Sequence, residues 1–513
     1  MSEHPARRAR STPGLPSFFI RTLLSVALPV VALTPAPATM AGQGVEDIVG
    51  AWVGGEVLPF ERPDSQAVYF TIRPDGSLAL SMIYEVGPRS RVWTYDIDVA
   101  YADGAVSWAY HQGSLNPARD TLKVLKDYNG DRSDWMWVRR PALDSLLSHL
   151  HGMGTAPFEY TIPPEIDDGW PAAAPEAVGL AGETMMDLLA SVAQGELGDI
   201  HSILVARRGT LVIEEYFAQN GSKHGPFIDS IFRNRVHHLA STTKSIASVL
   251  VGIALDRGYI GNAQDPIIRY LPDYAPLLTG GKEAITVGHL LSMSPGLQWF
   301  GRNTPGMVND DHAAWEVEDM VAYALGKPLA SDPGTRFNYS NATAAVAGAL
   351  LEDATDTDVG SFARENLFQP LGITDFLWTS YPDGTVETDG GLALRPRDLA
   401  RIGQLYLEGG RWDGVQIVPA AWVEESTRGR FRYGSAGGIS LTYGYFWMEA
   451  ALPSPEGDVR AFFHSGDGGQ FLMVVPDLDL VIVLTGGIYG RSVVGAYVPL
   501  IVRHVLSAVE TVE

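Results

Sequence analysis

The 513-residue chain contains no cysteine. It can therefore form no disulfide, use no thiol nucleophile and carry no lipid on an N-terminal cysteine. The sequence Gly-x-Ser-x-Gly is also absent, which excludes the nucleophile turn of the α/β-hydrolases. His-Glu-x-x-His, other metal-ligand clusters and phosphate-cradling glycine loops are missing as well, so we expect neither a metal nor another cofactor.

Positive charge is scarce in this chain. Its 60 Asp and Glu residues outnumber its 37 Lys and Arg residues, which gives a formal net charge of −23, and only six of the basic residues are lysine. This balance argues against nucleic acid or an anionic membrane surface as a partner, and it favours a solubilising surface. A lysine in an apolar stretch of such a chain therefore needs a physical explanation.

Long hydrophobic runs are confined to the N-terminus. Arginines precede an apolar run over residues 23–33, and small residues follow around Ala38 and Ala41. This pattern predicts a secretory signal peptide over residues 1–41, hence a bacterial periplasmic or secreted protein with no membrane contact after cleavage. An uncleaved N-terminal anchor is the alternative that the run leaves open, and the oligomeric state is not indicated.

The rest of the chain divides into three parts. Short strand patterns separated by turns such as Arg73-Pro74-Asp75-Gly76 predict a small all-β barrel or sandwich over residues 44–140. A linker follows over residues 141–175. Residues 176–513 hold both helix and strand patterns, and every motif that suggests chemistry lies there.

The most informative stretch is residues 238–258, whose apolar residues predict one helix buried on nearly all sides and ended by Gly258. Ser241 and Lys244 stand three residues apart at its start, on one face. Lost hydration and the positive helix terminus both lower the pKa of such a lysine. A neutral amine can then take the serine proton. Ser-x-x-Lys alone also occurs by chance, so it needs support from other motifs.

Two later motifs provide that support. Tyr339-Ser340-Asn341 lies on a predicted turn just before a small-residue helix, and His464-Ser465-Gly466 ends a strand before a glycine-rich entry to the next strand. Taken alone, Tyr339 would be interpreted as a structural turn residue.

In this order and spacing, the three motifs resemble those of the serine β-lactamase and penicillin-binding-protein superfamily. Tyr-x-Asn stands in place of its Ser-Asp-Asn element and His-x-Gly in place of Lys-Thr-Gly. Residues 293–299, 391–398 and 468–470 are similar to the class C-related subgroup of 6-aminohexanoate-oligomer hydrolases and family VIII carboxylesterases. The resemblance implies an α+β fold in which helices flank an antiparallel sheet and a helical subdomain is inserted between its strands.

The resemblance also implies roles for the motif residues. Ser241 attacks the substrate carbonyl and becomes acylated, while Lys244 and Tyr339 share the general-base function. Tyr339 would act as a phenolate or through Lys244, and the phenolate needs a neighbouring cation to lower its pKa.

The remaining roles concern binding. Asn341 is expected to orient Lys244 or the substrate. His464 is expected to bind the polar end of the substrate or to hydrogen-bond Tyr339, and Gly466 to contribute to substrate binding. The backbone N–H groups of Ser241 and Asp467 are expected to form the oxyanion hole.

The expected substrate is a small ester or amide. A histidine in place of the third-motif lysine removes a permanent cation, and Asp467 adds negative charge, so a carboxylate-bearing β-lactam is disfavoured. Two alternatives share the same motifs, namely a β-lactamase and a D-alanyl-D-alanine carboxypeptidase. A penicillin-recognising sensor or scaffold is the non-enzymatic alternative.

Overall fold

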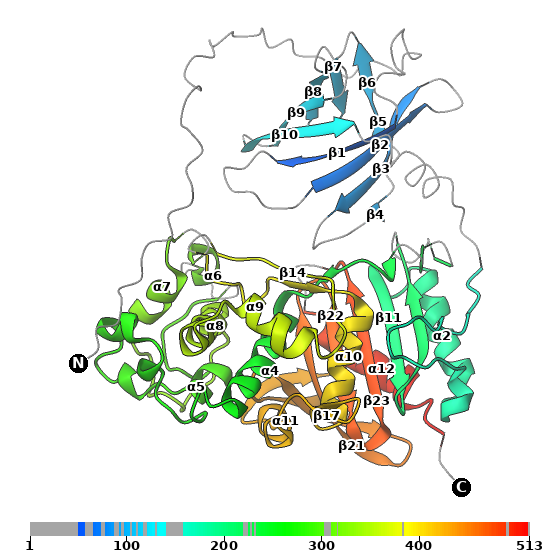
Figure 1. Ribbon diagram of the computed structural model, residues 1–513. Coiled ribbons are helices and arrows are strands. Elements are labelled where there is room, and N and C mark those ends of the chain that lie inside the picture. The colour runs from blue at the N-terminus through cyan, green and yellow to red at the C-terminus, as the bar shows by residue number, and fades with distance from the viewer. Residues whose placement is uncertain are drawn as a thin grey trace, which may run out of the picture.

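The computed structural model describes ten strands between residues 50 and 139, with Ser77 and Val99 beside them, and most of residues 157–510 (Figure 1). Within the second part, residues 219–223, 226–227, 230–231, 302–308, 315–316, 382–383 and 489–491 are not described. The predicted signal peptide over residues 1–41 lies outside the described residues, as does much of the predicted linker.

The N-terminal part is a ten-stranded antiparallel sheet in the order β4-β3-β2-β1-β10-β9-β8-β7-β6, with β5 paired to β3. Strands β5 and β6 lie on opposite edges of this order but are separated only by Val99, so the two edges approach each other. The strands are β1 Gly50–Glu56, β2 Ser65–Ile72, β3 Leu78–Val86, β4 Val92–Trp93, β5 Ile97–Asp98, β6 Ala100–Ala102, β7 Ala105–Trp108, β8 His111–Leu115, β9 Thr121–Tyr128 and β10 Asp131–Arg139.

The second part is built on an eight-stranded antiparallel sheet in the order β12-β11-β23-β22-β21-β20-β19-β18. Its strands come from both ends of this region, as predicted, because β11 pairs with β23. The strands are β11 Ile200–Arg207, β12 Thr210–Tyr216, β18 Phe431–Ala436, β19 Ile439–Tyr443, β20 Met448–Ser454, β21 Gly457–Gly466, β22 Gln470–Val475 and β23 Leu480–Gly486.

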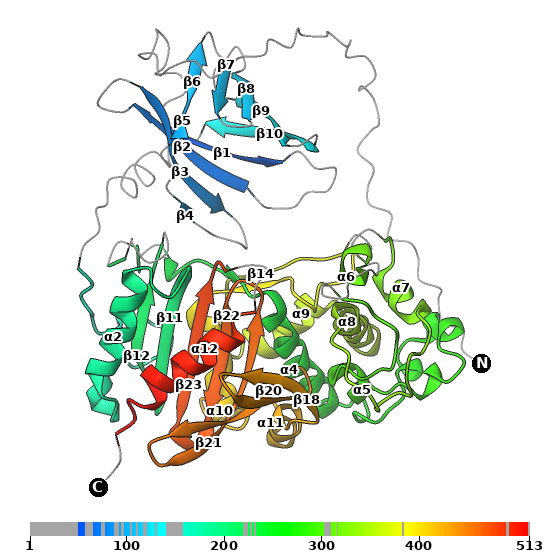
Figure 2. The ribbon, with the colours of Figure 1, turned by 180° about the vertical axis from the view of Figure 1, so that it is seen from behind.

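Helices cover both faces of this sheet. Helix α10 packs against β22 and β23 on one face, whereas α2 and α12 lie on the other (Figure 1, Figure 2). The central strands β22 and β23 are buried along their whole length, which explains their continuous runs of apolar residues. The helices on this sheet are α2 Gly182–Ala193, α10 Pro396–Leu407 and α12 Val494–Ile501.

A mostly helical subdomain lies between β12 and β18 in the chain, as predicted. Its centre is α8, which contacts α4, α5 and α7. The helices are α4 Thr243–Asp256, α5 Val287–Leu291, α6 Asp310–Ala313, α7 Met320–Gly326, α8 Asn341–Thr355 and α9 Val359–Ala363, followed by α11 Ala420–Thr427 nearer the sheet. Two small sheets complete the fold, made of β13 His237–His238, β14 Phe376–Trp378 and β15 Leu392–Leu394, and of β16 Arg411–Trp412 and β17 Val415–Gln416.

The helix that carries Lys244 begins later than the sequence pattern predicts. The pattern gives one helix over residues 238–258, but a 3-10 turn spans Ala240–Thr242 and α4 starts only at Thr243. The physical reason is tertiary pairing, since β13 is held extended by β15 and Ala240 adopts a positive φ of 46°. A non-glycine residue in this conformation interrupts a helix.

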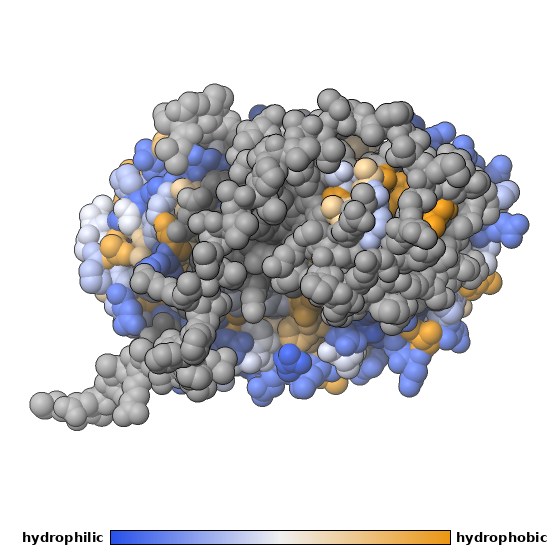
Figure 3. Space-filling view, turned by 90° about the horizontal axis from the view of Figure 1, so that it is seen from above, coloured by the Kyte–Doolittle hydropathy of each residue, from blue (hydrophilic) through white to orange (hydrophobic). Residues whose placement is uncertain are grey.

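The visible surface of the described residues is mixed in hydropathy. Figure 3 shows hydrophilic residues around the rim of the described surface, with hydrophobic residues scattered among them. Among the described residues, no helix is both long and apolar enough to span a membrane.

The packing of α4 gives a test of the fold. Gly252 faces the indole of Trp422, and a Cβ at this position would lie 2.1 Å from the indole Cδ1. We expect Gly252→Ala to lower the free energy of unfolding by about 1–3 kcal/mol, because the buried ring has to move.

Denaturant unfolding followed by tryptophan fluorescence measures this change. Gly495→Ala in α12 is the matched control, because a Cβ added there would meet no atom within 4 Å. It should leave stability unchanged or raise it by about 0.5–1 kcal/mol. An equal decrease in the free energy of unfolding in both variants would show that the packing of Gly252 on Trp422 is not tight.

Candidate active site

Ser241 lies on the 3-10 turn between β13 and α4, and its side chain is partly exposed. Two features fix this nucleophile turn. The Leu239 N–H donates to the Leu392 carbonyl at 2.8 Å, and Ala240 holds its positive φ. Backbone strain of this kind persists only where surrounding contacts enforce it, and it is concentrated at functional sites.

Lys244 lies in the first turn of α4 and is fully buried. Its Nζ donates to Ser241 Oγ at 3.0 Å, to Asn341 Oδ1 at 2.9 Å and to the Asp389 carbonyl at 2.5 Å. These three acceptors match the three donors of an ammonium group. The sequence motifs placed Ser241 and Asn341 beside Lys244, and the structure brings all three together.

Burial nevertheless favours the neutral form of this amine. Desolvation lowers the pKa of Lys244 to about 8, although the charges of Asp389 and Asp311 act in the opposite direction. A buried amine with this pKa changes its protonation state close to neutral pH, which is where a general base is most effective.

Tyr339 directly precedes the N-terminus of α8, where Ser340 is the N-cap and accepts from the Thr343 N–H. The ring centroid of Tyr339 lies 5.2 Å from Lys244 Nζ. The cap therefore fixes the turn that carries Tyr339, and it also fixes Asn341 as the first residue of the helix. The structure thus brings Tyr339 to the Ser241–Lys244 pair, as the motif spacing predicted.

The sequence left open whether Tyr339 acts as a phenolate or through Lys244, and its surroundings in the structure argue against the phenolate. Burial raises the pKa of Tyr339 above its ordinary value, against a smaller lowering by a hydrogen bond with Ser241. The ring also makes an edge contact with the buried Tyr443. These surroundings favour the neutral phenol over the phenolate.

His464 lies on β21 and is 1% exposed. Burial and the charge of Lys244 lower the pKa of His464 to about 3, so the imidazole is neutral. Both ring nitrogens are buried and have no hydrogen-bond partner among the described residues. His464 thus lies beneath the surface that solvent reaches, where the charge of Lys244 acts on its ring.

Gly466 ends β21 where this strand meets the nucleophile turn. A Cβ on Gly466 would lie 2.2 Å from the Leu239 carbonyl oxygen and 3.1 Å from the Ala240 Cβ. Glycine is therefore required for β21 to approach Ser241 so closely. Asp467 follows in the turn to β22, and its Oδ1 accepts from the Gly468 N–H at 3.1 Å.

Two residues near the site were not identified from the sequence. The Asp389 carbonyl binds Lys244, and its carboxyl group accepts a hydrogen bond from Tyr381. Asp311 contributes charge that acts on Lys244 and Tyr339. No sequence signal marks a carbonyl ligand, because every residue has one. Among the described residues, no group of three or more His, Asp or Glu side chains could hold a metal ion.

This fold and site define a class. An antiparallel sheet with helices on both faces, an inserted helical subdomain and a Ser-x-x-Lys pair at their junction characterise the serine β-lactamase and penicillin-binding-protein superfamily. A family model described as Beta-lactamase matches residues 197–486, which is more than half of the chain. The chain therefore belongs to the Beta-lactamase family.

Curated relatives lie within the subgroup that the motifs indicated. The chain is 27% identical over 213 residues to a 6-aminohexanoate-dimer hydrolase of Paenarthrobacter ureafaciens, covering 38% of this chain and 52% of that protein. It is 29% identical over 229 residues to esterase EstB of Burkholderia gladioli, covering 40% and 55%. The chain thus spans about half the length of these curated relatives.

Solved structures show the same fold. A family VIII carboxylesterase superposes with a TM-score of 0.50 at 19% identity, covering 64% of this chain and 96% of that one. The hydrolase EstCE1 gives a TM-score of 0.50 at 16% identity, covering 63% and 98%.

The close approach at Gly466 gives a test of the site. We expect Gly466→Ala to reduce labelling of Ser241 by a fluorescent phosphonate about 10²-fold, because the added methyl group pushes β21 away from the nucleophile turn.

Labelling rates at several probe concentrations measure this loss, with thermal unfolding recorded in parallel. Gly434→Ala on β18 is the control, because a Cβ there meets no atom within 4 Å, and it should label at the native rate. Native labelling by Gly466→Ala would contradict the requirement for glycine.

Proposed function

We propose that the protein is a serine hydrolase that cleaves small esters or amides through an acyl-enzyme on Ser241, with Lys244 as the general base. The observation that carries this proposal is the identity of the hydrogen-bond partners of Lys244. Asn341 Oδ1 and the Asp389 carbonyl oxygen can only accept hydrogen bonds. A neutral amine has two N–H groups and one lone pair. When the two carbonyl oxygens take the two N–H groups, the lone pair is left for Ser241 Oγ at 3.0 Å.

Acylation then follows from this geometry. Lys244 takes the Ser241 hydroxyl proton as Oγ forms a bond to the substrate carbonyl carbon. The resulting ammonium finds three acceptors already in place, so no rearrangement is needed. The carbonyl oxygen becomes negative and would be bound by the backbone N–H groups of Ser241 and Asp467.

Tyr339 completes the proton path in this proposal. As a neutral phenol beside both Ser241 and Lys244, it can donate its proton to the departing alcohol or amine and recover one from the Lys244 ammonium. Water then attacks the acyl-enzyme by the same route in reverse and restores Ser241.

The charge of the site supports a neutral acyl substrate. His464 is uncharged near neutral pH and so does not replace the cation of a third-motif lysine. Relatives named as an esterase and as a 6-aminohexanoate-dimer hydrolase support ester or amide cleavage over β-lactam cleavage. We also propose that the protein is exported, on the basis of the signal-peptide pattern in residues 1–41.

The nucleophile can be tested directly. We expect the native protein to bind a fluorescent phosphonate and to hydrolyse p-nitrophenyl acetate, whereas Ser241→Ala does neither. Lys244→Met should reduce both rates about 10²–10⁴-fold, because the serine loses its general base.

Lys282→Met is the matched control for the lysine variant. Lys282 also donates to carbonyl groups, those of Leu325 and Lys327, but lies outside the site, so this variant should retain native rates. A native protein that neither labels nor hydrolyses would contradict the proposal and favour a penicillin-recognising sensor, to be tested by binding of a fluorescent penicillin.

The pH dependence of kcat/KM tests whether Lys244 is the general base. The active form contains neutral Lys244, so kcat/KM should rise with pH through a midpoint near 8 as the ammonium loses its proton. Initial rates with p-nitrophenyl acetate, corrected for spontaneous hydrolysis, measure this profile. A rate that is constant or falls between about pH 6.5 and 8.5 would exclude neutral Lys244 as the catalytic base.

A further inference from the structure

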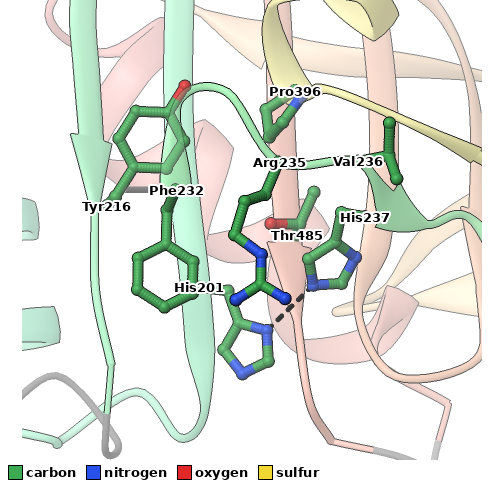
Figure 4. Close-up of a pocket in the computed structure, with 8 residues that line it drawn as sticks. All are labelled: His201, Tyr216, Phe232, Arg235, Val236, His237, Pro396 and Thr485. Atoms are coloured by element: carbon green, nitrogen blue, oxygen red, sulfur yellow. Dashed lines mark hydrogen bonds between the residues drawn. The ribbon is translucent and has the colours of Figure 1, made fainter. Parts of the chain in front are cut away.

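Two buried histidines lie next to each other outside the proposed catalytic set. His201 is on β11 and His237 on β13, and each is 6% exposed. His201 Nδ1 lies 2.9 Å from His237 Nε2, as the dashed line in Figure 4 shows. The other nitrogen of each ring also has a partner. His237 Nδ1 lies 3.0 Å from the His238 carbonyl oxygen, and His201 Nε2 lies 3.3 Å from Asp199 Oδ1.

The number of protons in this chain of contacts follows from its two ends. Both end groups, a carbonyl oxygen and a carboxylate, only accept hydrogen bonds. The three contacts therefore need three protons on the four ring nitrogens. Two neutral imidazoles carry only two. All three hydrogen bonds can form only when these residues together hold one proton more than an Asp199 carboxylate and two neutral imidazoles carry.

The extra proton belongs on His201. Burial and the neighbouring charge of His201 lower the pKa of His237 far below its ordinary value, which leaves His237 neutral. The His201 imidazolium then faces the Asp199 carboxylate. Half-buried Arg235 lies in the same pocket, and its positive charge contributes to the low pKa of His237 (Figure 4). Within the described part of the chain, the ionisable groups around the pair include Asp199, Tyr216, Arg235, His237, His238 and Tyr497.

His237 is connected through the backbone to the nucleophile turn. Strand β13 carries His237 and passes within two residues to Leu239, whose carbonyl oxygen is the atom that a Cβ on Gly466 would strike at 2.2 Å. The position of His237 therefore bears on both Ser241 and the end of β21.

Asp199 is connected through backbone hydrogen bonds to the turn that contains Asp467. The Asp199 carbonyl accepts from the Gly487 N–H at 2.8 Å, and the Ile488 N–H donates to the Gly468 carbonyl at 2.9 Å. A Cβ on Gly487 would lie 2.1 Å from Asp199 Oδ2 and 3.0 Å from His201 Nε2, so this segment packs directly on the charged pair.

We propose that the protonated His201–His237 pair, paired with Asp199, positions the nucleophile turn relative to the Gly466–Gly468 segment, which is predicted to supply the second oxyanion donor. Without the extra proton, His201 Nε2 would present a lone pair to the Asp199 carboxylate, and the contact would become repulsive. Both residues are positioning residues, since neither touches the reacting atoms. The proposal rests on the function proposed for Ser241 only in its kinetic consequence.

The proton itself can be observed without any activity. Long-range ¹H–¹⁵N spectra of the full chain labelled at its 12 histidines, assigned with a His201→Gln variant, report the protonation of each ring nitrogen. At about pH 6.5, His201 should carry protons on both nitrogens and His237 on Nδ1 only. Two neutral rings at this pH would overturn the proposal.

Asp199→Asn gives the kinetic test. The new amide can donate to a neutral His201 Nε2, so every contact in the chain is satisfied without the extra proton. Asp199 is not among the groups that shift the pKa of Lys244, so the titration of Lys244 should be the same in both proteins. The ratio of kcat/KM of the variant to that of the native protein should therefore rise about tenfold from pH 6 to 9, with KM changing less than about twofold.

Asp273→Asn, an exposed change of the same charge, is the matched control and should give a ratio that does not vary with pH. A flat ratio for Asp199→Asn would overturn the positioning role even if the extra proton is observed. Absence of hydrolysis by the native protein would instead refute the proposed function. In that case the spectra still decide the protonation of the pair, and backbone amide shifts of residues 466–468 across the same pH range decide whether it moves this segment.

Discussion

The arrangement of the site depends on one constraint, the hydrogen bonding of a fully buried amine. Lys244 Nζ has no contact with solvent and must find its partners within the protein. Ser241 lies on the adjoining 3-10 turn, and the other two partners come from distant segments, Asn341 at the start of α8 and the Asp389 carbonyl before β15. Satisfying a single side chain therefore fixes the relative positions of the nucleophile, the helical subdomain and a neighbouring strand.

Close backbone approach is the second requirement, and it explains why small residues stand at defined places. The end of β21 can reach the nucleophile turn only because Gly466 has no side chain, and Gly487 leaves room for the Asp199 carboxylate in the same way. The positive φ of Ala240 serves the same purpose, because it turns the chain from β13 into the helix while exposing Ser241. Strain and tight contacts of this kind are tolerated where the surrounding sheet and helices over-determine the geometry.

Much of the fold and part of the site followed from the sequence. The motif residues Ser241, Lys244, Tyr339 and Asn341 were identified from order and spacing, and the structure places them together. The start of α4 was predicted wrongly, because hydrophobic periodicity does not reveal that β13 pairs with β15. The predicted roles of His464 and Asp467 in binding and in the oxyanion hole stay predictions.

By itself the sequence determined the chemical groups and the elements that carry them, because side-chain identity, helical spacing and strand patterns are local properties. Only the tertiary structure decided their partners and the protonation of Tyr339, although the sequence already predicted a lowered pKa for Lys244. Burial lowers the pKa of Lys244 to about 8 and keeps Tyr339 a phenol, and these shifts arise from neighbours far away in the chain. The Asp389 carbonyl could not be recognised from the sequence, because every residue has a carbonyl group. The His201–His237 pair could not be recognised either, because the two histidines meet only in the folded protein.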